Sequence, residues 1–302
     1  MKNYFSLGLG LNKLSLLTIC LVLFLSACTP SKTTSYPQTI SQKGIEMVLV
    51  PAGEFKMGSD VEKAMDECQK NHSTCQGLYF DDQAPSHKVY LDAFYVDVYE
   101  VTNAAYAKCV DDGICNPPKE NSSYTRDHYF DNPTYADYPV VHVSWDDANT
   151  YCAWRGARLP TEAEWEKAAR GEKSFVYPWG NKFIGTNANL CDVSCIFPRA
   201  NKNLDDGYED TAPVGSYSEG GSPYGVYNMA GNVAEWVADW YAVDYYANSP
   251  RNNPSGPSEG SVRVARGGSC ISSDSWARSA TRIAAEPSAN SIDLGFRCAS
   301  SP

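Results

Sequence analysis

Alternating apolar and polar residues mark the first regular segments of the chain. The alternation begins over Glu46–Pro51, is interrupted at Gly53 and continues over Gly53–Met57. A longer alternating run covers His87–Tyr99. Because successive side chains of a strand point to opposite faces, a period of two is typical of half-buried strands. We therefore predict strands over these three segments.

Helix start and stop signals follow in the middle of the chain. The predicted helices are Thr102–Cys109, Ser144–Trp154 and Thr161–Arg170, and each is followed within a few residues by a glycine. In the last two, the first residue is followed three positions later by Asp147 or Glu164, the pattern of a capping box. After Tyr177, turn residues recur every few positions and predict loops and short strands. The fold class predicted is an α+β domain with little regular secondary structure.

The domain organisation follows from length and composition. The chain has 302 residues, no internal repeat, and no Pro/Gly/Ser-rich linker after residue 44. A chain of this length can form one large domain that buries most of its apolar surface. We therefore predict a single domain over residues 44–300.

The N-terminal segment has the features of a targeting signal. An apolar run, too short to span a bilayer comfortably, lies between Lys13 and Cys28 and ends in Leu25-Ser26-Ala27-Cys28. This ending resembles a bacterial lipobox, in which small residues precede the cysteine that accepts diacylglycerol. The pattern predicts a lipoprotein signal peptide over 1–27, lipidation at Cys28 and a Ser/Thr-rich tether over 28–43. Ordinary secretion with cleavage near Ala27 is the alternative.

These signals predict an extracytoplasmic lipoprotein of the bacterial cell envelope, with the membrane as a partner through the lipid anchor. Thr29 occupies the place of the Asp that retains lipoproteins in the inner membrane of enteric bacteria, so the outer membrane or the cell surface is expected. A net charge of −11 argues against nucleic acid, which requires a positive surface.

The cysteines agree with an oxidising compartment. Of eleven cysteines, nine remain once Cys20 and Cys28 are set aside, so one is odd. Closely spaced cysteines suggest three disulfides, Cys68–Cys75, Cys109–Cys115 and Cys191–Cys195. Zinc is the competing interpretation, but the spacings are not CxxC and histidine is scarce.

Several short motifs, in a fixed order over about 250 residues, together resemble one known family. They are Val50–Ser59, Val143–Ala148, Arg158–Glu166, Tyr177–Asn181, Asn228–Trp236, Arg266–Ser269 and Gly295–Cys298. The chain resembles the formylglycine-generating-enzyme, or sulfatase-modifying-factor, family. That resemblance implies a fold related to C-type lectins.

The resemblance also implies two structural calcium sites. Calcium takes six to eight oxygen ligands, including carboxylates, amides and backbone carbonyls. The implied ligands are Asn228 and Glu235 by side chain with Gly231 and Val233 by carbonyl, and Asn189 and Asp206 by side chain with Leu190 and Tyr208 by carbonyl. Turn capping by the Asn and Asp side chains, without an ion, is the alternative.

A long-range disulfide between Cys152 and Cys298 is implied in the same way. With the three local pairs it leaves Cys270 unpaired. The oxidases of the family carry two cysteines shortly after Gly-Gly-Ser, which bind copper(I) and convert a cysteine in a Cys-x-Pro-x-Arg peptide to formylglycine. Here the segment after Gly268 contains Ser269 and a single cysteine, Cys270. One thiolate cannot provide the two that linear copper(I) coordination requires. Copper is therefore not expected.

Other catalytic groups are scarce. Cys270 is expected to be a buried apolar side chain, and a surface thiol with a redox or intermolecular role is the alternative. Ser269 has no nearby histidine in the sequence and is expected to be a turn residue. His142 lies in an apolar run and is expected to be a core imidazole.

These observations favour a non-oxidase module that binds a peptide, protein or glycan at a membrane surface. The expected recognition surface is the segment 270–293 with Trp240, Tyr241 and Tyr245, while Trp236 is expected in the core. One alternative is a formylglycine-generating oxidase, which would use Cys270 and Ser269. Another is a structural lipoprotein in envelope or motility assembly. The segment from Arg266 to Arg297 also resembles the variable proteins of diversity-generating retroelements.

Overall fold

Three small sheets and five short α-helices make up the regular structure of the described residues. A computed structural model of the chain describes residues 36–70 and 80–302. The predicted signal peptide, Cys28 and Cys75 lie outside these residues. Tyr36–Pro302 forms one compact unit, and its mixture of helices and sheets confirms the predicted α+β class.

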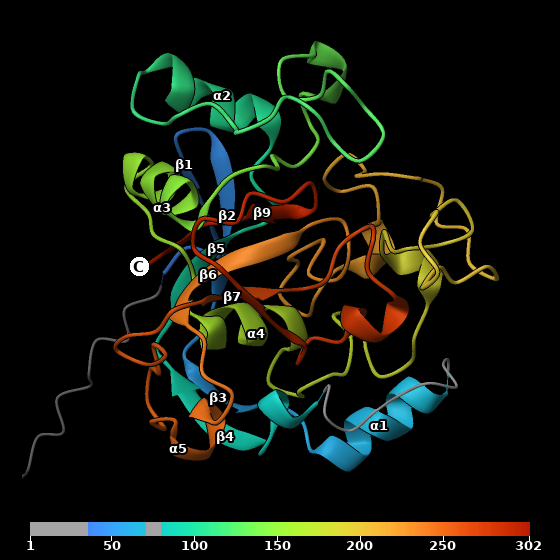
Figure 1. The fold of residues 1–302 in the computed structure, drawn as a ribbon. Coiled ribbons are helices and arrows are strands. Elements are labelled where there is room, and N and C mark those ends of the chain that lie inside the picture. The colour runs from blue at the N-terminus through green and yellow to red at the C-terminus, as the bar shows by residue number, and fades with distance from the viewer. Residues whose placement is uncertain (1–35, 71–79) are drawn as a thin grey trace, which may run out of the picture. The chain divides into compact units, whose positions relative to one another are not determined.

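The strands form three separate sheets (Figure 1). The first has the order β1-β2-β5-β10 and consists of β1 (Thr39–Gln42), β2 (Ile45–Val50), β5 (Phe94–Asp97) and β10 (Ala299–Ser300). A two-stranded sheet pairs β3 (Gly53–Met57) with β4 (His87–Leu91). The third has the order β8-β7-β6-β9 and consists of β6 (Ala234–Trp240), β7 (Arg263–Arg266), β8 (Arg282–Ala285) and β9 (Leu294–Phe296). Every pairing is antiparallel except that of β6 with β9.

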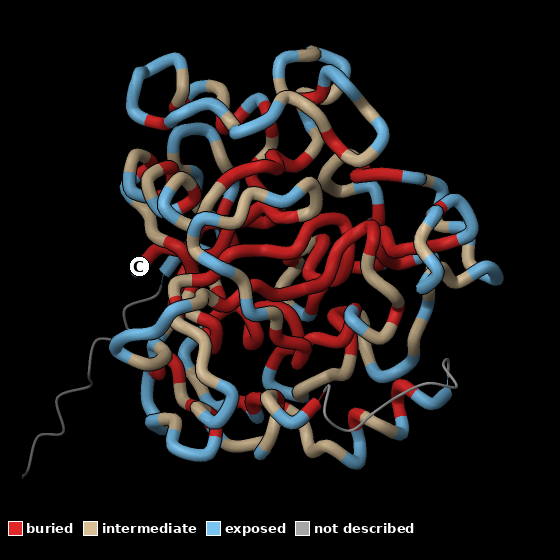
Figure 2. The backbone as a smooth tube through the Cα atoms, in the orientation of Figure 1, coloured by how far each residue is buried: buried red, intermediate tan, exposed pale blue. Residues whose placement is uncertain are grey.

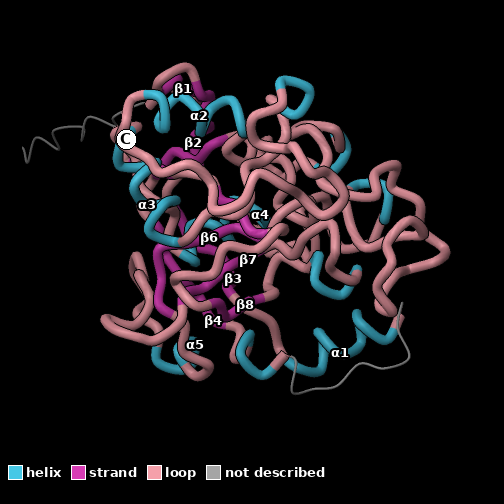
Figure 3. The backbone as a smooth tube through the Cα atoms, turned by 45° about the horizontal axis from the view of Figure 1, so that its top comes forward, coloured by secondary structure: helices cyan, strands magenta, loops and turns pink. Residues whose placement is uncertain are grey.

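The helices are short and lie between the strands. They are α1 (Val61–Gln69), α2 (Asn103–Asp111), α3 (Trp145–Trp154), α4 (Glu162–Arg170) and α5 (Tyr245–Asn248). Single 3₁₀ turns cover Asp81–Gln83, Pro133–Tyr135, Gly185–Asn187, Ser218–Gly220 and Asp274–Ala277. Residues 171–233, all of them described, contain no α-helix or strand, and Figure 3 shows how much of the domain consists of loops.

The predicted helix starts are confirmed by their hydrogen bonds. Thr102 accepts a hydrogen bond from the Ala105 amide and begins α2. Both capping boxes are formed, with Ser144 and Asp147 at α3 and Thr161 and Glu164 at α4. Local signals of this kind depend on residues within one turn of helix, so the sequence alone identifies them.

Two boundaries differ from the prediction. The run His87–Tyr99 is not one strand, because β4 pairs with β3 whereas β5 pairs with β2 and β10, so the chain changes sheet between them. The expected tether over 28–43 is too long: Thr39–Gln42 forms β1, an edge strand paired with β2. Its exposed, polar side chains made it resemble a linker in the sequence.

The core surrounds α4, as the buried backbone at the centre of Figure 2 shows. All nine residues of α4 are buried, including its charged ones. Each buried carboxylate of this helix meets an arginine: Glu166 accepts from Arg170 and Arg266, and Glu162 accepts from Arg282. Such pairing is required because an isolated buried charge is strongly destabilising.

A second buried ion pair connects the first sheet to α3. Asp97 at the end of β5 accepts two hydrogen bonds from Arg155, at 2.6 and 2.8 Å, and both side chains are fully buried. Asp97 also accepts from the Cys298 amide, next to the disulfide Cys152–Cys298 that joins α3 to the C-terminal strand. One carboxylate therefore supports the junction of three segments.

Replacing this carboxylate tests its importance. Asp97→Asn would leave the Arg155 guanidinium buried without a counter-charge, and we expect a loss of about 3–5 kcal/mol in the free energy of unfolding. In a domain of this size the thermal midpoint should fall by more than about 6 °C. The matched control is Glu54→Gln, which removes the partner of Arg251 at an exposed position and should leave the midpoint unchanged. Equal midpoints for both variants in differential scanning calorimetry would contradict this interpretation.

Candidate functional site

A sharp turn after β7 positions the residues of the candidate site. Gly267 and Gly268 have φ angles of +95° and +70°, which only glycine adopts readily. A Cβ on Gly267 would lie 3.1 Å from the ring of Trp165, so the turn also packs closely on α4. The amide of Cys270 then donates to the carbonyl of Asn232, which holds the turn against the loop before β6.

Cys270 is an interior thiol. Its side chain is 3 % exposed, in agreement with the expected buried position. Burial raises the pKa of the Cys270 thiol well above its ordinary value, and the negative charges of Asp210 and Asp293 raise it further. The thiolate, which is the nucleophile and the metal ligand, is therefore disfavoured at neutral pH.

No second thiol accompanies Cys270 in the described part of the chain. The predicted disulfides Cys109–Cys115, Cys191–Cys195 and Cys152–Cys298 are all present. Cys68 is also disulfide-bonded, while its predicted partner Cys75 lies outside the described residues. A copper(I) ion held between two cysteine thiolates does not fit this set of residues.

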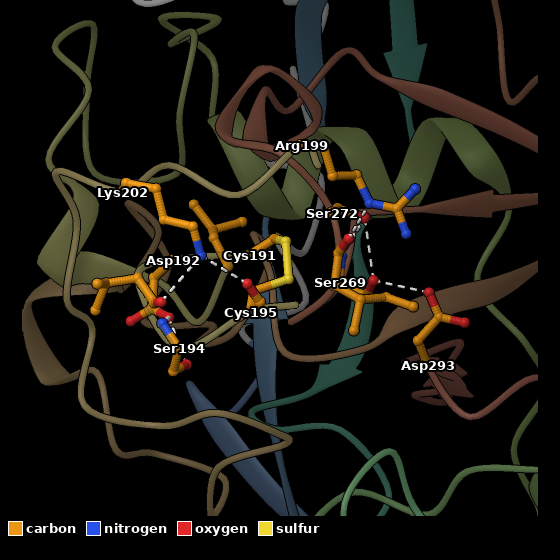
Figure 4. Close-up of a disulfide and its surroundings, with 12 residues drawn as sticks. Cys191, Asp192, Ser194, Cys195, Arg199, Lys202, Ser269, Ser272 and Asp293 are labelled. Carbon is orange, nitrogen blue, oxygen red and sulfur yellow. Dashed lines mark hydrogen bonds between the residues drawn. A yellow bond between two sulfur atoms is a disulfide. The ribbon is translucent and has the colours of Figure 1, made fainter. Parts of the chain in front are cut away.

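The Ser269 hydroxyl is engaged in hydrogen bonds within the domain. Its hydroxyl donates to the Asp293 carboxylate at 2.8 Å and shares a hydrogen bond with Ser272 (Figure 4). These contacts close the turn onto the segment before β9. His142 is buried as expected, with Nδ1 facing the Asn290 carbonyl at 2.8 Å, and Nε2 has no partner among the described residues. None of these contacts gives Ser269 a histidine base.

The residues of one implied calcium site lie together in the loop that follows Asn189. Asp206 accepts from the amides of Leu190 and Tyr208 and from the Tyr217 hydroxyl, which is the turn capping expected in the absence of an ion. The Oδ1 atom of Asn189 is buried and has no partner within the described residues. Burial raises the pKa of Asp206 to about 7. The amide oxygen and the carboxylate are each oxygen ligands of the kind that calcium takes.

At the other implied calcium site, the carboxylate already has an arginine partner. Glu235 is fully buried and both of its carboxylate oxygens accept from Arg297, at 2.6 Å each. Trp165 donates to the same carboxylate. Asn228 and Gly231 adopt left-handed conformations, with φ of +58° and +75°, so the loop bends as a cation loop requires. Glu235 itself, however, serves as the partner of an arginine.

Glu100 is a residue that the sequence did not single out. It is 2 % exposed, accepts from the Asn232 side chain, and its Oε1 atom has no partner in the described residues. Burial, and then the charge of Glu235, raise the pKa of Glu100 well above its ordinary value. Glu100 therefore has one buried carboxylate oxygen without a hydrogen-bond partner in the described residues. A single acid after a strand gives no sequence signal for this role.

The structure buries part of the expected recognition surface. Trp236 is in the core as expected, and most of residues 270–282 are buried as well, whereas residues 283–293 are intermediate or exposed. Trp240 stacks on the Arg263 guanidinium at 3.5 Å, and Tyr241 donates to Asp82. These aromatics are thus engaged within the domain. Within residues 270–282, the large apolar side chain that reaches solvent is that of Trp276, which is 40 % exposed.

No helix of residues 36–70 or 80–302 is long and apolar enough to cross a membrane.

Comparison with known proteins agrees on one family. The family described as "Sulfatase-modifying factor enzyme 1-like domain" matches residues 32–302. The chain is 36% identical over 292 residues to the formylglycine-generating enzyme of Streptomyces coelicolor, which covers 83% of this chain and 88% of that protein. It is 32% identical over 298 residues to the inactive C-alpha-formylglycine-generating enzyme 2 of Bos taurus, with 85% and 88% covered. The structure of PvdO from Pseudomonas aeruginosa aligns with a TM-score of 0.67 at 28% identity, and covers 89% of this chain and 100% of that one.

Proposed function

Because the chain belongs to the family of sulfatase-modifying factor enzyme 1-like domains, we propose that it is a non-oxidase binding module of that family, displayed outside the cytoplasm at a membrane surface. The observation that carries this proposal is the state of the cysteines. Cys270 is buried, and it is the free cysteine of the described residues. The similarity to both an enzyme and a protein named inactive does not separate the two functions.

The argument against oxidation rests on ligand number and protonation. Linear copper(I) coordination needs two soft ligands, and thiolates are the groups that supply them. A single thiol whose pKa is raised by burial offers one ligand, and that one is protonated at neutral pH. What remains is a rigid domain with long loops, an arrangement that suits binding of a peptide, protein or glycan.

A copper titration tests this proposal. We expect purified protein to bind copper(I) no more tightly than the Cys270→Ser variant, measured in competition with a chromogenic copper(I) chelator. We also expect no conversion of a Cys-x-Pro-x-Arg peptide to formylglycine, followed by the loss of mass of the peptide. The enzyme of Streptomyces coelicolor is the positive control for both measurements.

Two results would contradict the proposal. One is copper(I) binding that the Cys270→Ser variant loses. The other is peptide conversion above that of the variant. Either would favour the alternative of a formylglycine-generating oxidase, which the names of the relatives support.

The membrane location is a separate part of the proposal and rests on the sequence Leu25-Ser26-Ala27-Cys28. We propose that Cys28 carries the lipid and that the domain lies in the envelope outside the cytoplasm. In bacteria given a labelled fatty acid, the wild-type protein should acquire the label and the Cys28→Ala variant should not. If both proteins are labelled equally, or if the wild-type protein is not labelled, lipidation at Cys28 is refuted.

Structural calcium is also proposed, at the loop that contains Asn189 and Asp206. The unpartnered Oδ1 of Asn189 and the desolvated carboxylate of Asp206 support it. Calcium would supply a positive counter-charge for the Asp206 carboxylate and would fix the ends of the loop. Asn228 and Glu100 would hold a second ion in the same manner.

The pH dependence of calcium stabilisation provides the test. The pKa of Asp206 is about 7 in the folded protein against an ordinary value of 3.8, so without calcium its ionisation lowers the stability as pH rises from about 4 to 7. Above pH 7 the carboxylate is charged and free to bind calcium; at pH 5 it is protonated. We therefore expect millimolar calcium to raise the thermal midpoint by about 5 °C or more at pH 8 and by less at pH 5.

The control for this measurement is the neighbouring acid. Asp206→Asn should abolish most of the calcium effect at pH 8, whereas Asp205→Asn, at an exposed position, should preserve it. A calcium effect that is the same at both pH values, or that survives in Asp206→Asn, would count against the site.

A further inference from the structure

One loop of the domain presents apolar side chains to solvent on a rigid support. We call residues 191–204 the braced loop, because the disulfide Cys191–Cys195 closes its first turn. Its backbone is also tied internally, since the amide of Val193 donates to the Leu204 carbonyl and the amide of Asn201 donates to the Cys191 carbonyl. The disulfide and these hydrogen bonds thus hold the two ends of the loop together.

The apolar side chains of this loop face outward. Ile196 is 80 % exposed, the most exposed large apolar residue of the described chain, and Val193 is 47 % exposed. Val193 lies between the two bonded cysteines and Ile196 follows Cys195, so the disulfide constrains the backbone that carries both. A single exposed isoleucine would need no explanation, whereas several exposed apolar side chains gathered on one surface mark an interaction site.

A second segment extends this surface. The turn Asp274–Ala277 packs beside the braced loop, where the Asn201 side chain donates to Asp274 at 3.0 Å. The amide of Cys191 donates to the Ser272 carbonyl at 2.9 Å and joins the same two segments. This turn carries the exposed Trp276. Val193, Ile196 and Trp276 therefore come from two segments that are hydrogen-bonded to each other.

Two cations lie at this surface. The Lys202 ammonium donates to the carbonyls of Val193 and Cys195, and the Arg199 guanidinium donates to the carbonyl of Ile271 at 2.6 Å. Figure 4 shows Lys202 and Arg199 on opposite sides of the disulfide. The partners in these hydrogen bonds are neutral carbonyls, so neither cation is paired with a carboxylate through them. The nearby carboxylate of Asp192 is turned inward and accepts from the amides of Ser194 and Asp206.

We propose that Val193, Ile196 and Trp276, with Arg199 and Lys202 beside them, bind an extended peptide segment of a partner protein that combines apolar side chains with Asp or Glu. The inference deepens the proposed binding function and rests on it. The apolar contacts would supply affinity, and the two cations would select acidic segments in a protein whose net charge is −11.

The charge of the protein favours a short protein segment over a lipid bilayer. A net charge of −11 opposes docking of the whole domain on an anionic membrane, whereas a short segment meets only the charges at the surface that binds it. Membrane binding is therefore an outcome of the test that would overturn the proposal.

The experiment uses a library of random 12-residue peptides displayed on phage, selected against the full chain in detergent with 1 mM calcium. We expect the enriched peptides to combine apolar residues with Asp or Glu. For a synthesised peptide of that kind, followed by fluorescence anisotropy, the dissociation constant should rise at least tenfold in Ile196→Ser. It should also rise when the salt concentration is raised from 50 to 500 mM.

The matched control is Ile114→Ser, which removes an isoleucine of 55 % exposure from another turn and should change the dissociation constant less than twofold. Both variants should keep the wild-type thermal midpoint, because both side chains are exposed. Peptides that bind Ile196→Ser as tightly as wild type would overturn the location while leaving the binding function intact. No enriched peptide, or binding to phosphatidylglycerol vesicles that Ile196→Ser abolishes, would overturn the inference itself. Peptide oxidation would instead refute the proposed function.

Discussion

The buried pair of Arg297 and Glu235 is the interaction on which the rest of the domain depends. The guanidinium meets both carboxylate oxygens at 2.6 Å and also donates to the carbonyls of Asp97, Val98 and Tyr227. Neither side chain is exposed. The pair thereby connects β6, the C-terminal segment and the end of β5, while Trp165 of α4 donates to the same carboxylate. Removing either charge would leave the other buried and unpaired, which is among the most destabilising changes a domain can suffer.

The same support determines the position of Cys270. The double-glycine turn packs on Trp165, and Trp165 is fixed by Glu235, so the position of residues 269–270 is determined by the core. Cys270 is buried there, and burial raises its pKa. Under the proposed function, the scaffold is retained without the oxidase chemistry.

The sequence predicts local features better than those that depend on distant contacts. The capping boxes at Ser144 and Thr161 and the close pairs Cys109–Cys115 and Cys191–Cys195 involve neighbours in the chain, and the structure contains them. The change of sheet between β4 and β5 depends on pairing with strands far away, and an alternating pattern does not contain that information. The role of Glu100 arises only where Asn232 and Glu235 approach it. The burial of residues 270–282 likewise comes from segments that pack over them.

Within the described residues the protein has one reduced cysteine, Cys270, and it is shielded from solvent. Alkylation with iodoacetamide followed by peptide mass mapping, with and without denaturant, tests this most directly. We expect no alkylation of the native protein, and alkylation of Cys270 alone among the described cysteines once the chain is unfolded without reductant. Rapid alkylation of native Cys270 together with a second cysteine of residues 36–70 or 80–302 would contradict the account, because two accessible thiols would then be available to hold a metal.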